Sequence, residues 1–192
     1  MYICHHLFNP IKANMKNLFL SVALLGTLAL ASCEKIKDAI FPSFEHDVPE
    51  VTVTVPINPI VGSDVVLGSY EFQFNVDSLI RKYTAQQLGI DNAGDIVIKS
   101  VILNVNNADD LNNFSNFENV KLAVSGNGRP EQVVVAEAAI TSAASPLVVP
   151  GNNTDLKSYI KAGQMRYTLT GRAKKITTKP LQVSVQVQLK IK

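Results

Sequence analysis

The clearest pattern in the chain is a strict alternation of apolar and polar residues near its C-terminal end. From Leu181 to Ile191, every second residue is leucine, valine or isoleucine, and the residues between them are glutamine, serine or lysine. Successive side chains of a β-strand point to opposite faces, so this segment predicts a strand with core on one face and water on the other. Such half-buried strands are typical of antiparallel sheets.

Other segments predict strands by alternation or by their β-branched and aromatic residues. With the last strand included, the predicted strands are residues 51–55, 65–74, 95–105, 119–125, 132–140, 146–150, 165–173 and 181–191. The apolar residues of 95–105 cannot all keep one phase, which indicates a β-bulge near Ser100 or burial on both faces. Turn residues at 126–130 predict a hairpin, and residues 174–180 are expected to join the last two strands as another.

Two segments predict short helices. Asn75 is a suitable N-cap for a helix that runs to about Leu88, and residues 154–160 predict a second helix that Gly163 stops. Seven or eight strands with one or two short helices predict an all-β fold. We expect an antiparallel two-sheet β-sandwich, of immunoglobulin-like or jelly-roll topology.

The N-terminal part of the chain has the pattern of a secretory signal. Residues 15–17 carry a positive charge, a mostly apolar run follows at 18–30, and two small residues then precede Cys33. These are the three parts of a signal peptide, and we expect translation to start at Met15. Spanning a bilayer takes about 20 apolar residues, so a transmembrane helix is disfavoured.

The segment 30–33, Leu-Ala-Ser-Cys, resembles the lipobox of bacterial lipoproteins. In that family, signal peptidase cuts before the cysteine and diacylglycerol is attached to its thiol. The resemblance therefore implies a signal peptide at 1–32, a lipidated Cys33 and a membrane as partner. Residues 33–50 contain few periodic apolar residues and are expected to form a tether, and residues 51–192 the sandwich domain.

The same segment is similar to that of small envelope lipoproteins of Bacteroidetes-type bacteria, many of which lie on the outer membrane. This resemblance implies an outer-membrane location for the chain, attached through lipid. The residues that follow Cys33 match the surface-export signal of that group only in part. The periplasmic face and the cell-surface face are therefore both left open.

The cysteine and histidine content limits the chemistry. The chain has 2 cysteines and 3 histidines. After the expected cut only Cys33 and His46 are left, so no internal disulfide, metal site or histidine-based catalytic site is expected, and no cofactor. Loops 91–95 and 106–110 are rich in the oxygen ligands that calcium prefers, but they lack the spacing of an EF-hand loop. Ordinary turns are favoured there, and calcium binding is left open.

The charges are unevenly distributed, although the formal net charge is only +2. From Lys161 onward the chain has basic residues and no acidic ones. This asymmetry indicates an electropositive face for an anionic glycan, lipid headgroups or an acidic partner, or else scattered charges paired with acids elsewhere in the fold. We favour paired charges, and we expect no binding of nucleic acid by an exported protein.

The candidate binding residues lie beside the predicted loops. Phe114 and Phe117 border a polar loop and are the aromatic residues least obviously committed to the core, and Arg172, Lys174 and Lys175 form the densest basic cluster. These five residues are the candidate binding patch. The favoured alternative for the phenylalanines is an apolar plug over one end of the sandwich, and for the basic residues a solvated turn that discourages aggregation.

These features favour a non-enzymatic envelope lipoprotein whose sandwich has a binding or structural role. Its expected partner, besides the membrane, is a protein or a glycan. One alternative is an adhesin or pilus-type accessory subunit, in which an exchanged strand joins protomers. An alternative from another class is a hydrolase that uses carboxylates. Its candidate residues are Asp109 and Asp110, although adjacent residues on a strand point apart and these two lie in a predicted loop.

Overall fold

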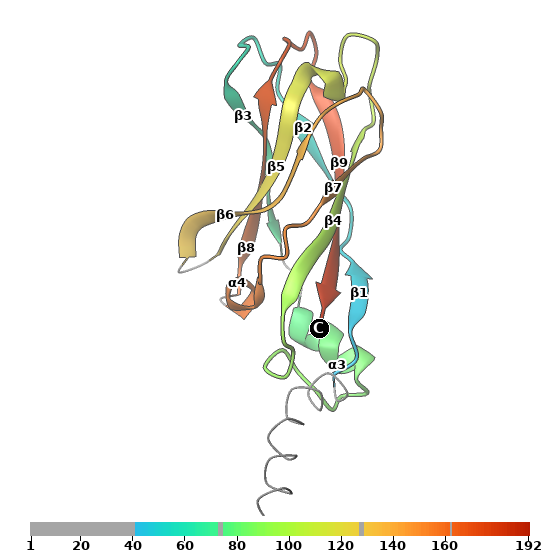
Figure 1. The fold of residues 1–192 in the computed structure, drawn as a ribbon, viewed down its shortest axis with the longest axis vertical. Helices are drawn as coiled ribbons and strands as arrows, with labels where there is room; N and C mark the ends of the chain where they lie inside the picture. The colour runs from blue at the N-terminus through green and yellow to red at the C-terminus, as the bar shows by residue number, and fades with distance from the viewer. Residues whose placement is uncertain (1–40, 73–74, 127–128, 162) are drawn as a thin grey trace, which may run out of the picture. The chain divides into compact units, whose positions relative to one another are not determined.

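Two antiparallel sheets pack face to face (Figure 1). The computed structural model describes residues 41–72, 75–126, 129–161 and 163–192. One sheet consists of β1 (Phe44–Asp47), β2 (Val51–Val55), β4 (Ile96–Val105), β7 (Leu147–Pro150) and β9 (Leu181–Ile191). The other consists of β3 (Asp64–Phe72), β5 (Phe117–Gly126), β6 (Arg129–Ala139) and β8 (Met165–Ala173). This arrangement confirms the predicted all-β two-sheet sandwich.

Strand β9 is central to the first sheet. It pairs with β4 along one side, and with β2 and then β1 along the other, so that the order is β1-β9-β4-β7 with β2 also beside β9. The second sheet has the order β3-β8-β5-β6. All six apolar residues of the alternating segment are buried, as the period-2 pattern predicted.

Buried side chains form a main core between the sheets and a smaller one at one end. In the smaller core, Leu79 and Ile80 of α3 (Val76–Tyr83) cluster with Phe41 and Ile191. Asn75 caps this helix as predicted, because its side-chain oxygen accepts a hydrogen bond from the backbone N–H of Ser78 at 2.9 Å.

Helix α3 ends earlier than expected. Ala85 and Gln86 have positive φ angles of 50° and 68°, and such residues cannot continue a right-handed helix. The chain therefore leaves the helix after Tyr83, and Leu88 lies outside it. A second helix, α4 (Lys157–Lys161), and a single 3₁₀ turn, η1 (Phe114–Asn116), are the remaining described helical elements.

Several local predictions are confirmed. The register of β4 against β9 shifts between Ile98 and Ser100, which is the expected bulge. Strands β5 and β6 form the predicted hairpin. Strand β7 lies at a sheet edge, and the predicted strand 65–74 is β3, with residues 73 and 74 outside the described residues.

The prediction of a tether up to residue 50 was wrong for residues 41–50. Within this segment, β1 pairs with the last four residues of β9. Phe41 and Val48 are buried. The two prolines, Pro42 and Pro49, flank β1 rather than interrupt it, so every ladder hydrogen bond of the strand remains available. Residues 33–40, the rest of the expected tether, lie outside the described residues.

The predicted hairpin between the last two strands was also wrong. Strand β8 pairs with β3 and β5, whereas β9 belongs to the opposite sheet. Residues 174–180 therefore cross from one sheet to the other. Turn composition alone does not distinguish a hairpin from such a crossing, because both need a short polar connection.

Gly151 provides a test of the sheet packing. A Cβ atom at this position would lie 1.8 Å from the carbonyl oxygen of Ile98. We expect Gly151→Ala to lower the free energy of unfolding by about 3 kcal/mol, because the backbone must move to relieve this overlap. Chemical denaturation measures the change. Gly94→Ala is the control, since its Cβ would lie at an ordinary 3.4 Å from the carbonyl oxygen of Lys192. Equal effects of the two variants would contradict the close approach of Gly151 to Ile98.

Candidate functional site

Three loops meet at the end of the sandwich opposite to α3. We call residues 56–63, 106–116 and 174–180 the apex loops; they connect β2 to β3, β4 to β5 and β8 to β9 (Figure 1). Strand β9 begins at this end, and its last residue, Ile191, lies in the small core beside α3. The apex is thus at the far end of β9 from Phe41, which belongs to the same small core.

Asn116 joins two of the apex loops. Its side-chain amide is almost fully buried and donates hydrogen bonds to the carbonyl oxygens of Leu111 at 3.0 Å and Ile176 at 2.8 Å. The backbone carbonyl oxygen of Asn116 accepts hydrogen bonds from the backbone N–H groups of Lys174 and Lys175. The buried side-chain amide and the backbone carbonyl of Asn116 together fix the backbone of both loops, because any opening would leave polar groups unpaired.

Asn58 joins the third loop to the same place. Its backbone N–H donates to the hydroxyl of Thr177 at 2.9 Å, and the N–H of Thr177 donates to the carbonyl of Asn58. The side-chain amide of Asn58 donates to the carbonyl oxygen of Ile60 at 2.8 Å. All three loops are therefore linked through residues 176 and 177.

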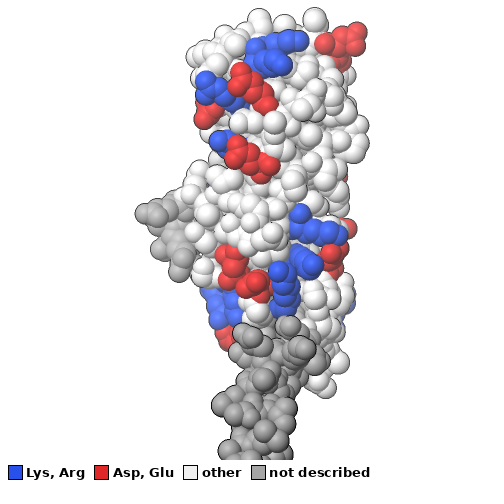
Figure 2. Space-filling model, viewed as in Figure 1, with Lys and Arg blue, Asp and Glu red and all other residues white. Residues whose placement is uncertain are grey.

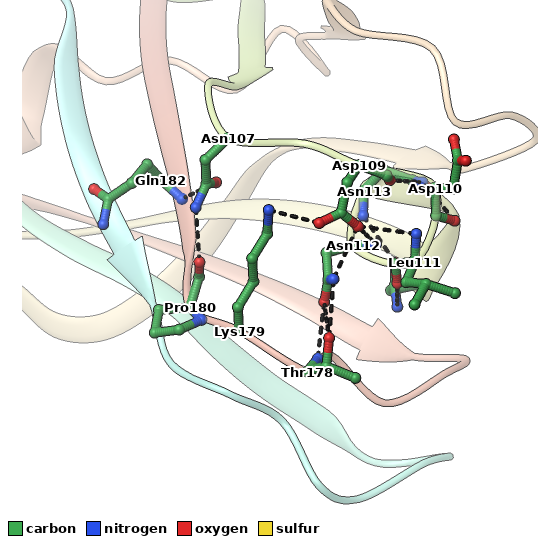
Figure 3. A network of polar contacts seen from close by, with 11 residues as sticks. Asn107, Asp109, Asp110, Leu111, Asn112, Asn113, Thr178, Lys179, Pro180 and Gln182 are labelled. Carbon is green, nitrogen blue, oxygen red and sulfur yellow. Dashed lines mark hydrogen bonds and ion pairs between the residues drawn. The ribbon is translucent and has the colours of Figure 1, made fainter.

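Asp109 and Asn112 complete this network (Figure 3). Asp109 accepts hydrogen bonds from the backbone N–H groups of Leu111 and Asn112 and pairs with the Lys179 ammonium at 2.6 Å. Asn112 in turn accepts from the N–H of Thr178 at 2.8 Å. The Lys179 ammonium first, and then the Asn112 side chain, hold the pKa of the Asp109 carboxyl well below its ordinary range.

The protonation state of the Asp109 carboxyl is relevant to the alternative of a hydrolase that uses carboxylates. A carboxylate kept ionised by these donors cannot act as a general acid near neutral pH. Its role in the described structure is to hold the turn of loop 106–116 and to attach it to Lys179. Among the described residues, no three histidine, cysteine, aspartate or glutamate side chains gather as they do around a metal ion.

The apex loops expose large apolar side chains. Ile60, Leu111 and Ile176 are 61%, 70% and 52% exposed, and Ile57 and Val61 are also more than half exposed. The carbonyl groups of the first three are the ones that the buried asparagines bind. The backbone is therefore held in place while the aliphatic side chains point into solvent.

The structure does not bring the five residues of the candidate binding patch together on the surface. Phe114 and Phe117 are each 2% exposed and belong to the main core, so the prediction that they contact a ligand was wrong and the alternative of a plug is confirmed. The chain turns at η1, where Asn113 caps the turn, and this directs both rings inward. Lys174 and Lys175 are exposed beside Ile176, and neither forms an ion pair with a described residue.

The remaining basic residue of the patch, Arg172, is paired with acids. It lies 3.2 Å from Glu118 and 3.6 Å from Asp64. Lys161, Arg166 and Lys179 are likewise paired, with Asp91, Glu71 and Asp109. Figure 2 shows basic and acidic side chains close together on the face in view. The favoured interpretation of the charge asymmetry, paired charges, is confirmed for these four residues.

Sequence reasoning missed the exposed aliphatic residues of the apex. They are Ile57, Ile60, Val61, Leu111 and Ile176. For all but Ile57, the available signal is that each stands among turn-forming residues without an apolar partner two positions away. Ile57 follows the alternating valines of residues 51–55 by two positions, after Pro56. Cys33 lies outside the described residues. No helix in the described part of the chain has the length and apolar character needed to cross a bilayer.

The lowered pKa of Asp109 gives a prediction for acid stability. A carboxyl whose folded-state pKa is depressed stabilises the fold above about pH 4 and loses this contribution as the pH falls further. Asp109→Asn removes the charge, so we expect the difference in unfolding free energy between wild type and variant to shrink from pH 6 to pH 2. Urea denaturation at each pH measures it.

Asp110→Asn is the control for this measurement, because the Asp110 carboxylate has no hydrogen bond or ion pair with a described residue. A difference between wild type and Asp109→Asn that is constant with pH would show that Lys179 does not stabilise the carboxylate.

Comparison with known proteins adds no assignment. No protein-family model matches the chain, and no curated protein matches it. The functional interpretation therefore depends on the geometry of the apex and on the sequence around Cys33.

Proposed function

We propose that the chain is a non-enzymatic lipoprotein of the bacterial outer membrane, anchored through Cys33, whose sandwich binds another protein at the apex loops. The lipobox-like segment 30–33 supports the anchor. The observation that carries the binding role is the set of exposed aliphatic side chains on loops that buried asparagines hold in place.

The apex has the composition of a binding surface for a protein. Apolar side chains at the centre of a contact supply its energy when they leave water, and charged residues at the rim stay solvated. Here Ile60, Leu111 and Ile176 supply the apolar groups, and Lys174 and Lys175 supply the rim. Because the loops are already fixed, little conformational entropy is lost when a partner binds.

The position of the apex suits an anchored protein. Phe41, the first described residue, lies in the small core at the opposite end of the sandwich. An attachment on the N-terminal side of Phe41 leaves the apex loops free for a partner. In this proposal, the lipid on Cys33 holds the protein at the membrane, and the apex loops bind the partner protein.

Photo-crosslinking in the envelope tests the apex. The full chain carries a photo-reactive amino acid at position 174 and is compared with the same chain carrying Leu111→Ser and Ile176→Ser. We expect the wild-type apex to give a discrete crosslinked protein, and the double variant to reduce its yield about tenfold, since two buried contacts are lost.

Val148→Ser is the matched control, because Val148 is 57% exposed, as much as the apex residues, but lies on β7. Equal yields from the wild type and the double variant would contradict the proposal, as would an equal loss in Val148→Ser.

Mass spectrometry of the protein extracted from bacterial membranes tests the anchor. We expect a mature chain that begins at Cys33 and carries the additional mass of diacylglycerol. In Cys33→Ser we expect neither the cut before residue 33 nor the lipid mass, because the thiol is the acceptor. Ser32→Ala keeps a small residue before Cys33, serves as control and should behave as wild type. An unmodified Cys33 in the wild type would refute the anchor.

A further inference from the structure

The outer face of the second sheet contains a groove that is separate from the apex. It has a volume of about 570 Å³ and lies over β3 and β8 beside the end of the β5–β6 hairpin. The register between β5 and β6 shifts twice, at residues 122–123 and 124–126. Bulges bend a strand, and Figure 1 shows the end of the hairpin leaving the line of the sheet. The volume is in the range of small-ligand sites, about 300–1,000 Å³.

The floor of the groove is polar. Ser69 and Thr168 are placed by the β3–β8 register, in which they lie opposite each other. The amide of Gln132 donates to the Thr168 hydroxyl oxygen at 3.3 Å, and the hydroxyl oxygens of Ser69 and Thr168 are 3.5 Å apart. Ser69 also donates to the carbonyl oxygen of Tyr167 at 3.2 Å. These groups form a row of hydroxyls and amide across three strands.

This row keeps hydrogen-bonding capacity for a ligand. Each hydroxyl oxygen has two acceptor lone pairs, and the Gln132 amide has a second N–H and a carbonyl oxygen. Thr168 is only 7% exposed, so its hydroxyl is held at the base of the groove by the packing around it. The floor therefore presents fixed polar groups that are both donors and acceptors.

The sides of the groove carry one positive and one negative side chain, whose charges balance. Arg166 and Glu71 form an ion pair directly across the β8–β3 register. Their unused N–H groups and carboxylate lone pairs can hold two neighbouring hydroxyl groups, as guanidinium and carboxylate groups do in a bidentate manner. Val66, 57% exposed, supplies an apolar surface on the same side.

We propose that this groove binds a neutral oligosaccharide. A sugar offers closely spaced hydroxyl groups, which match the row of Ser69, Thr168 and Gln132 and the Arg166–Glu71 pair. Its C–H faces match Val66. The balanced charge of the groove does not favour an anionic ligand. A peptide that adds as a strand needs a free strand edge. The groove opens on the face of the sheet over β8, which is paired on both sides, whereas the free edges of this sheet belong to β3 and β6.

A glycan array and an NMR titration of the full chain test this proposal. The array contains neutral and acidic glycans, and the neutral oligosaccharide that binds best is then titrated into the ¹⁵N-labelled chain. We expect saturable shifts of the amide signals of Ser69, Gln132 and Thr168. Thr168→Val removes the hydroxyl with little change in shape, and we expect it to weaken binding about tenfold.

Thr170→Val is the matched control, because Thr170 lies two residues further along β8, on the same face and outside the groove. It should bind as wild type. If Thr168→Val does not fold, Gln132→Ala replaces it, since Gln132 is exposed and its loss leaves the core intact.

Several outcomes would overturn the proposal. They are no saturable binding of any neutral glycan, stronger binding of acidic glycans, shifts confined to the apex loops, and equal affinities of Thr168→Val and Thr170→Val. Saturable binding of a Gly-Ser-Thr-Asn-Gly peptide at the groove without any saccharide would assign the groove to peptides instead. None of these outcomes depends on the apex variants, so the two proposals fail separately.

Discussion

Strand β9 holds the sandwich together in two ways at once. Its backbone pairs with β1, β2 and β4, and its apolar face contributes six buried side chains to the cores. Burying a leucine, valine or isoleucine side chain contributes about 1.5–3 kcal/mol, so the strand stabilises the sandwich through its side chains as well as through its backbone. The other face of β9 stays polar, which allows the first sheet to face water.

The strands were predictable from the sequence because half-buried strands repeat with period 2, which no helix does. The short β1 was not, because the strand has only four residues with a proline on either side. Its pairing depends on an edge of β9 more than 140 residues away in the chain. The end of α3 depends on backbone angles at Ala85 and Gln86, which residue type does not determine.

The candidate sites were less predictable than the strands. The sequence located the polar loops but not the orientation of Phe114 and Phe117, because an aromatic residue beside a polar loop can face either way until the 3₁₀ turn is formed. The groove was not found at all. Ser69, Gln132 and Thr168 come from three strands, and their proximity arises only from the register of β3, β8, β5 and β6.

The way in which β1 lies on β9 also determines how the domain responds to tension. Phe44 faces Ile191 and Asp47 faces Gln188, so β1 runs from the α3 end toward the apex. A pull at Phe41 that is opposed at the apex acts along the axis of β1. Such a force shears all the hydrogen bonds between β1 and β9 together instead of opening them one after another from an end. Separating β1 from β9 in this direction therefore requires all four residue pairs to break together.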